Sequence, residues 1–170
     1  LDGPHESFYH NGKIEFRGSY RAGQLDGAQE WFHKNGQLME RQAYVKGRKH
    51  GPWEMLHDNG QLRSRGNFTD GLRDGPFEVF HKNGQPRSRG THCQDLRNGA
   101  YIAFYENGQI EARGHFANGK KTGIWEWFHE NGQLRRKGNY MDDQPEGTLE
   151  TFYAGGQIKA RETYRQGAQD

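Results

Sequence analysis

The stretch Trp125–Gly138, WEWFHENGQLRRKG, places an aromatic-rich run before Asn131-Gly132 and an alternating run after it. Asn-Gly between two such runs predicts a β-hairpin with a two-residue type I′ turn, in which both central residues have positive φ. The same pattern returns seven times without insertion or deletion. Each copy opens at a glycine, and the copies are 24 residues apart: Gly3, Gly27, Gly51, Gly75, Gly99, Gly123 and Gly147. A short fixed period predicts stacked structural repeats.

Positions in each repeat are counted from its opening glycine as position 1. Position 3 is usually large, position 6 is nearly always Phe, positions 9 and 10 are Asn-Gly, position 12 is Ile or Leu, and position 18 is Tyr or Phe. Glycines at positions 16 and 21 mark a bend and a second turn. No helical period is present. We therefore expect an all-β fold of tandem β-hairpin repeats, about fourteen strands in one elongated, twisted and curved antiparallel sheet, as a single domain over residues 1–170.

A two-residue turn would place position 7 opposite 12, 5 opposite 14, and 4 opposite 15. Positions 3, 5, 7, 12, 14 and 18 then share the more apolar face, which we expect to be packed. On the other face a glutamate lies across from a base in most repeats, which predicts a register-fixing row of charge pairs. The expected pairs are Glu6–Arg17, Glu30–Arg41, Glu54–Arg65, Glu78–Arg89, Glu126–Lys137 and Glu150–Arg161.

Composition excludes several functional classes. The formal net charge is only +2, so binding to nucleic acid is not expected and membrane contact is not favoured. Apolar residues are 31%, mean hydropathy is −1.23, and no apolar run reaches the length of a membrane helix. Cys93 is the single cysteine, so no disulfide framework is expected. The chain begins at Leu1, which fits removal of a signal peptide.

Catalysis and metal binding are not expected from the repeated residues. Four histidines occupy position 7, namely His33, His57, His81 and His129. Each repeat contributes two strands, so histidines of adjacent repeats lie about 10 Å apart. That distance is too large for them to bind the same metal ion. The glutamates have the same spacing, which is too wide for a catalytic pair of carboxylates, and each lies beside a base. No sequence motif of a catalytic nucleophile is present. The sequence therefore predicts a protein with no cofactor and no enzymatic activity.

The fourth repeat departs most from the pattern, and we expect a partner to bind near it. Pro86 replaces Ile or Leu, His92 replaces the aromatic residue, and Asp95 replaces the turn glycine. Proline in a strand removes a hydrogen-bond donor, so Pro86 predicts a local opening or bulge. In the fifth repeat Ile102 interrupts the glutamate row. The predicted partner-binding residues are the aromatic and basic side chains around these departures: Phe80, Arg87, Arg89, His92, Phe104 and Arg113.

The unit G-x-W-x-x-F-x-x-N-G-Q-L-x-x-R-G-x-Y-x-x-G resembles MORN repeats, and more closely their bacterial variant, which is typical of YwqK-like antitoxins and related immunity proteins. The resemblance extends from Gly3 to the end of the chain. It implies a non-enzymatic protein that binds and neutralises a cognate toxin, such as a phospholipase effector of a type VI secretion system. It also implies a location in the bacterial periplasm, with the cytoplasm as the other compartment.

The sequence is also compatible with two other functions. Eukaryotic MORN proteins have been linked to membrane phospholipids, but the near-balanced charge counts against a phospholipid-binding scaffold here. Cell-wall and choline-binding modules also use short aromatic hairpins, with clustered tryptophans. This chain has four tryptophans, and only Trp125 and Trp127 share a repeat. The edge strands of a single sheet would also allow copies to pair end to end.

Overall fold

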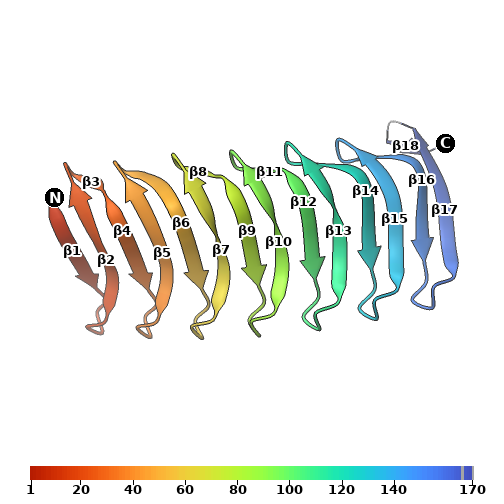
Figure 1. Cartoon of the computed structure of the whole chain (residues 1–170). Coiled ribbons are helices and arrows are strands. Elements are labelled where there is room, and N and C mark those ends of the chain that lie inside the picture. Colours follow the sequence, from red (N-terminus) through yellow and green to blue (C-terminus); the bar gives the residue numbers. More distant parts are fainter. Residues whose placement is uncertain (166, 170) are drawn as a thin grey trace. The chain divides into compact units, whose positions relative to one another are not determined.

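The computed structural model of the protein describes residues 1–165 and 167–169, and every regular element within them is a β-strand (Figure 1). The chain divides into two compact units, Leu1–Gly84 and Gln85–Asp170, with the border inside the fourth repeat. The predicted all-β fold of seven antiparallel hairpin repeats is confirmed. The assignment of residues 1–170 to one domain stays a prediction.

The strands of the first unit follow the repeats in order. They are β1 (Gly3–Phe8), β2 (Ile14–Arg21), β3 (Gln24–Leu25), β4 (Gly27–Phe32), β5 (Leu38–Val45), β6 (Arg48–Leu56), β7 (Leu62–Thr69), β8 (Leu72–Arg73) and β9 (Gly75–Phe80). The long strands pair in the order β1, β2, β4, β5, β6, β7, β9, always antiparallel. Consecutive repeats of this unit are therefore paired strand to strand.

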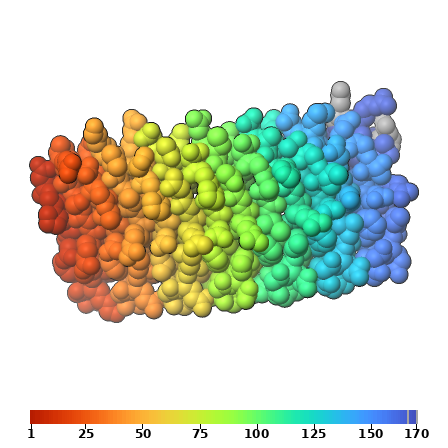
Figure 2. Space-filling view, viewed as in Figure 1, coloured from red at the N-terminus to blue at the C-terminus, as the bar shows by residue number. Residues whose placement is uncertain are grey.

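The second unit repeats this arrangement. Its strands are β10 (Pro86–Cys93), β11 (Leu96–Arg97), β12 (Gly99–Phe104), β13 (Ile110–Ala117), β14 (Lys120–Phe128), β15 (Leu134–Met141), β16 (Gln144–Phe152), β17 (Ile158–Arg165) and β18 (Ala168–Gln169). The long strands pair antiparallel in chain order. In the space-filling view, consecutive hairpins of each unit form consecutive bands of colour (Figure 2). Pro86 is the first residue of β10, where a missing amide donor is tolerated.

The Asn-Gly turn differs from the expected type. In the sixth repeat, the Gly132 amide donates to the His129 carbonyl at 2.8 Å and the His129 amide donates to the Gln133 carbonyl at 2.8 Å. Gly132 has a φ of 82°, whereas Asn131 is not among the residues with positive φ. This is a three-residue loop that ends in a left-handed glycine, so the prediction of a type I′ turn here is wrong.

The longer loop shifts the register only beside the turn. Phe128 pairs with Leu134, so position 6 lies opposite 12 and position 7 does not. A bulge then restores the expected register, with Trp127 opposite Arg136 and Glu126 opposite Lys137. Position 12 consequently shares the face of the position 6 phenylalanine, rather than the packed face where we placed it.

The type I′ turn occurs at positions 20 and 21 instead. Asn118 and Gly119 have φ of 49° and 83°, and the second repeat places Lys46 and Gly47 in the same turn with φ of 49° and 76°. Val45 pairs with Arg48 across this two-residue loop. Lysine is strained in the left-handed region, whereas asparagine tolerates it.

Lys46→Asn should therefore stabilise the protein by about 0.5–1 kcal/mol, because it relieves this backbone strain. The change is measured as a shift in the denaturant midpoint. Lys34→Asn is the matched control, since Lys34 is also exposed in a turn but has no positive φ. Equal effects of the two substitutions would contradict the strain argument.

The packed face, called here the aromatic face, comprises positions 3, 5, 14, 16, 18 and 23. In the second unit its buried cluster consists of Phe116, Trp125, Tyr140 and Leu149, with Trp127 among the residues packed against it. Ring contacts continue along it, and the centroids of Phe116 and Trp125 lie 4.9 Å apart. With no second layer of structure in the unit, these side chains are buried by their neighbours in the same sheet.

The position 16 glycines make this packing possible. A Cβ added at Gly114 would lie 2.3 Å from Cδ2 of Trp125 in the next repeat, and one added at Gly138 would lie 2.4 Å from Cδ1 of Leu149. Neither glycine has positive φ. We expected these glycines to mark a bend, but the structure gives them a different role: the missing side chain leaves room for the large residue at position 3.

Gly114→Ala should lower the free energy of unfolding by about 2–3 kcal/mol, because the added methyl group collides with the Trp125 ring. Thermal or denaturant unfolding measures the loss. Gly155→Ala is the control: its nearest contact is the flexible end of Gln157 at 2.7 Å, so a change within about 0.5 kcal/mol is expected. A stable Gly114→Ala protein would show that the glycine is not needed for packing.

The first unit replaces part of this packing with buried amides. Gln29 occupies position 3 and Gln42 occupies position 16, and both are fully buried. The Gln29 side chain donates to the Ser19 carbonyl at 3.0 Å. Gln42 donates to the Ala43 carbonyl at 2.7 Å, and its Oε1 and the Trp53 indole nitrogen are left without partners. In the sixth repeat the corresponding indole of Trp125 donates to the His115 carbonyl at 3.0 Å.

Side chains at positions 7 and 9 join successive repeats. Tyr105 donates its hydroxyl to the Phe128 carbonyl at 2.8 Å, and His129 Nε2 lies 3.1 Å from the Phe152 carbonyl. The Asn131 amide donates to the Ala154 carbonyl at 2.9 Å. The asparagine thus links repeats as well as shaping its own turn. The histidine–tyrosine interchange at position 7 follows from this shared hydrogen bond.

Candidate functional site

The six predicted partner-binding residues are divided between the two units and, within the second unit, between its two faces. Phe80 belongs to the first unit, and the other five belong to the second unit. Arg89 lies over the Phe104 ring, with its guanidinium carbon 5.3 Å from the ring centroid. His92 stands at position 18, on the aromatic face, whereas Arg87, Arg89 and Arg113 stand on the opposite face.

That opposite face, called here the ladder face, carries the glutamate and basic residues of positions 4 and 15. Glu126 contacts Arg113 at 2.7 Å and Lys137 at 3.1 Å, and Glu150 contacts Arg161 at 2.7 Å. Of the other expected pairs, Arg17–Glu6 and Arg41–Glu30 also form, at 2.7 and 2.9 Å. The charges therefore bind strand to strand as the sequence predicts.

The charge pairs also cross from one hairpin to the next. Arg65 is the Cα partner of Glu54, but its side chain bonds Glu78 of the following repeat at 2.7 Å. The prediction of a Glu54–Arg65 side-chain pair is therefore wrong, although its register is right. Arg113 reaches Glu126 across hairpins in the same way.

The basic side chains of the ladder face also cover phenylalanines. Arg113 lies 5.3 Å from the Phe128 ring centroid, and Arg17 lies 5.9 Å from that of Phe32. In both cases the ring belongs to position 6 of the next repeat. The arginine side chains thus pack on phenylalanine rings and also form ion pairs with glutamates. Both kinds of contact are within the sheet, so the bases of this face already have structural partners.

The Glu126 carboxyl titrates differently from an ordinary glutamate. Partial burial acts to raise its pKa, but hydrogen bonds and charges from Arg113 and Lys137 together hold the pKa below its ordinary value of 4.5. A carboxyl with a lowered folded-state pKa contributes stability above the unfolded-state value, and this contribution disappears as the pH falls through the folded-state pKa.

Glu126→Gln should therefore destabilise the protein by about 1 kcal/mol at pH 7, and the difference from the wild type should close as the pH falls below 4.5. Melting temperatures at several pH values measure this. Glu130→Gln, in the exposed turn four residues on, should follow the wild type throughout. A gap of constant size at all pH values would exclude the ion pairs as its cause.

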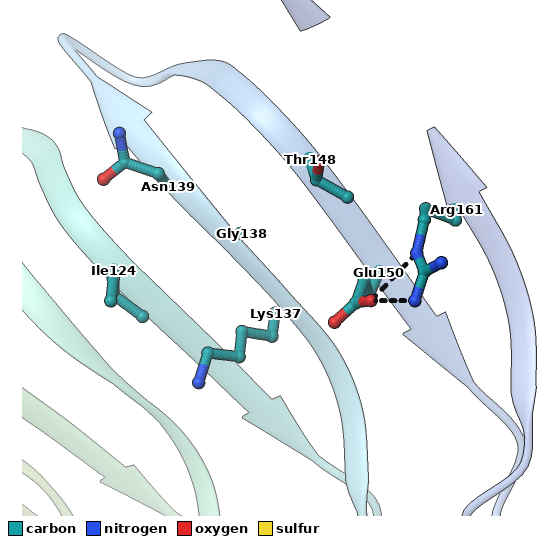
Figure 3. Close-up of a pocket in the computed structure, with 7 residues that line it drawn as sticks. All are labelled: Ile124, Lys137, Gly138, Asn139, Thr148, Glu150 and Arg161. Atoms are coloured by element: carbon teal, nitrogen blue, oxygen red, sulfur yellow. Dashed lines mark hydrogen bonds and ion pairs between the residues drawn. The ribbon is translucent and has the colours of Figure 1, made fainter. Parts of the chain in front are cut away.

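A shallow pocket of about 510 Å³ opens on the ladder face of β14–β17 (Figure 3). Its lining residues are Ile124, Lys137, Gly138, Asn139, Thr148, Glu150 and Arg161. Its charged groups already have partners, because Glu150 holds Arg161 and Glu126 holds Lys137. The pocket therefore offers a ligand small polar side chains and neutralised charges.

The aromatic face carries a set of bases that sequence reasoning missed. Position 23 pairs with position 18, so its side chain stands beside the aromatic residues. Arg97 lies 5.3 Å from the ring centroids of both Tyr101 and Phe116. Lys121 lies within 5.8 Å of three rings. The signal in the sequence is the base at position 23 of four consecutive repeats: Lys49, Arg73, Arg97 and Lys121.

The described residues contain no group of three or more His, Cys, Asp or Glu side chains that could hold a metal ion. Cys93 is a free, exposed thiol. No helix long and apolar enough to cross a membrane occurs in the part of the chain that the structure describes.

Comparison with known families gives one match. The model of the MORN repeat variant matches the chain seven times in succession, at residues 1–22, 25–46, 49–70, 73–94, 97–118, 121–142 and 145–166. Adjacent matches begin 24 residues apart, as the hairpins do. No curated protein matches the chain significantly.

Proposed function

Because the chain belongs to the MORN repeat variant family, we propose that it is a non-enzymatic scaffold that binds and neutralises a toxic protein effector. MORN repeats are in general protein- or lipid-binding modules. The finer proposal, an immunity or antitoxin protein of the YwqK-like type, goes beyond that general role. It concerns a cognate effector of a bacterial secretion system, such as a type VI phospholipase, neutralised in the periplasm.

The observation that carries the proposal is the aromatic face of the second unit. It presents the half-buried Trp127 together with Lys121 and Arg136, next to the buried Tyr140, and within the described residues of that unit no second layer covers them. Tryptophan, tyrosine and arginine are the residue types that contribute most to protein–protein binding. Contacts between rings, and between rings and cations, hold these side chains in place, so little order has to be created on binding.

The six residues predicted around the fourth repeat remain part of the proposal, and those of the second unit that lie on its ladder face, Arg87, Arg89, Phe104 and Arg113, form a second candidate surface. Within the second unit, Arg89 and Arg113 are both Cα partners of Ile102, where the ladder face lacks its glutamate. Arg89 thus lies over the Phe104 ring on the ladder face, beside a gap in the row of glutamates.

A phospholipid-binding scaffold is the alternative, and the bases of the aromatic face are the observation in its favour. This alternative predicts that the protein binds anionic vesicles and that the binding weakens as salt is added. The ion-paired bases of the ladder face give a membrane little net charge to bind.

The product of the neighbouring gene should co-purify with this protein, and its toxicity on expression should be suppressed when the two are co-expressed. A catalytically inactive form of that product allows the complex to be purified and its affinity measured. An unrelated β-repeat protein expressed at the same level serves as the control. Toxicity that persists, together with no detectable complex, would exclude the immunity function.

A further inference from the structure

The centre of the second unit's aromatic face holds a lysine among three rings. Lys121 Nζ lies 5.6 Å from the Trp125 ring, 5.8 Å from Trp127 and 5.7 Å from Tyr140. Such contacts attract the ammonium group electrostatically but leave its full charge in place. An anion can therefore still bind on the side of the ammonium that the rings do not cover.

A second base stands beside the first. The Arg136 guanidinium carbon lies 5.5 Å from the Trp127 ring, so Trp127 contacts both cations. Arg136 Nε is buried and has no hydrogen-bond partner. Burial raises the pKa of the nearby Tyr140 phenol, an effect that the charge of Arg136 opposes. The phenol is therefore a neutral hydrogen-bond donor at physiological pH.

The two faces of the second unit differ in how their bases are neutralised. On the ladder face, Arg113, Lys137 and Arg161 each contact a glutamate. Across the described residues, no carboxylate forms an ion pair with the Lys121 ammonium or the Arg136 guanidinium, although the Lys121 backbone amide donates to Asp143 Oδ1 at 2.9 Å. The acidic side chain on that face, Glu162, accepts a hydrogen bond from Tyr164 at 3.0 Å. The uncompensated positive charge is thus concentrated on the aromatic face.

We infer that this part of the aromatic face binds an acidic segment of the protein partner, with Asp or Glu side chains contacting Lys121 and Arg136. The inference rests on the proposed protein-binding function and adds the face that is used and the charge of the segment that it binds. A carboxylate matches the planar fork of an arginine, and the exposed part of Trp127 offers area for the residues between the carboxylates.

A protein segment fits these residues better than a lipid surface does. Lys121 and Arg136 are half-buried between rings, so an anion must enter the face to reach them. An extended chain can place single carboxylates there, whereas anionic headgroups in a bilayer are attracted mainly to exposed bases. Binding to vesicles is accordingly the competing outcome of the test.

The test uses a fluorescein-labelled decaglutamate peptide, with fluorescence anisotropy of the label as the readout. The wild-type protein should bind this peptide, more weakly as salt is added, and should not bind a decalysine peptide. Lys121→Met combined with Arg136→Met should weaken binding about tenfold. Arg135→Met combined with Lys159→Met removes the same charge from exposed ladder-face positions of the second unit and should leave the affinity within about twofold.

Circular dichroism and the melting temperature establish that each variant is folded. Lys121→Arg combined with Arg136→Lys keeps both charges and should keep most of the binding, which separates lost charge from lost packing. The inference is overturned if the peptide does not bind, if the Lys121/Arg136 methionine variant binds as the wild type does, or if the ladder-face variant loses more affinity. Binding to phosphatidylglycerol vesicles without binding to the peptide would also overturn it, in favour of a lipid ligand.

The same variants separate this inference from the proposed function. If the Lys121/Arg136 methionine variant still neutralises the neighbouring gene product, the function stands and the placement of its binding site is wrong. If the peptide binds but no toxin is neutralised by the wild type, the immunity function is wrong and the preference of this face for acidic chains stands.

Discussion

A sheet with no second layer has to bury its large side chains against its own neighbours, and this constraint explains most of the repeat. The position 3 residue lies over the position 16 glycine, as Trp125 does over Gly114. Any side chain at the glycine would fill the space that the ring occupies. The 24-residue period is therefore fixed by packing between repeats as well as by the length of a hairpin.

The same constraint gives the side chains of the two faces different roles. On the ladder face, adjacent strands are held in register by two kinds of contact. Glu126 forms ion pairs with two bases, and arginines cover phenylalanine rings. Their charges are neutralised within the sheet. On the aromatic face of the second unit, rings and bases pack on one another, and Lys121 and Arg136 have no ion-paired carboxylate within the described residues. A partner that approached the ladder face would have to compete with existing ion pairs, whereas the aromatic face offers charge without that competition.

The sequence was sufficient to predict the hairpins, their period and the alternation of faces, because these follow from local pattern. It was insufficient for the turns: Asn131-Gly132 matches a type I′ signal, yet its asparagine is used to bond the next repeat, and the type I′ turn forms at Asn118-Gly119. The role of Gly114 and the setting of Lys121 depend on contacts between repeats, which a pattern within one repeat does not contain. The predicted partner residues were chosen for departure from the pattern, and they fall on both faces.

The central claim is that the partner binds the aromatic face of the second unit, because the bases of the ladder face are already occupied by contacts within the sheet. Backbone and indole NMR signals of the isotope-labelled protein, recorded with and without the neutralised effector, test it directly. The account predicts that the largest shifts on binding fall on the indoles of Trp125 and Trp127 and on the amides around Lys121 and Arg136. Shifts confined to the strands' ladder-face residues, around Arg113, Glu126 and Lys137, with the indoles unchanged, would contradict it.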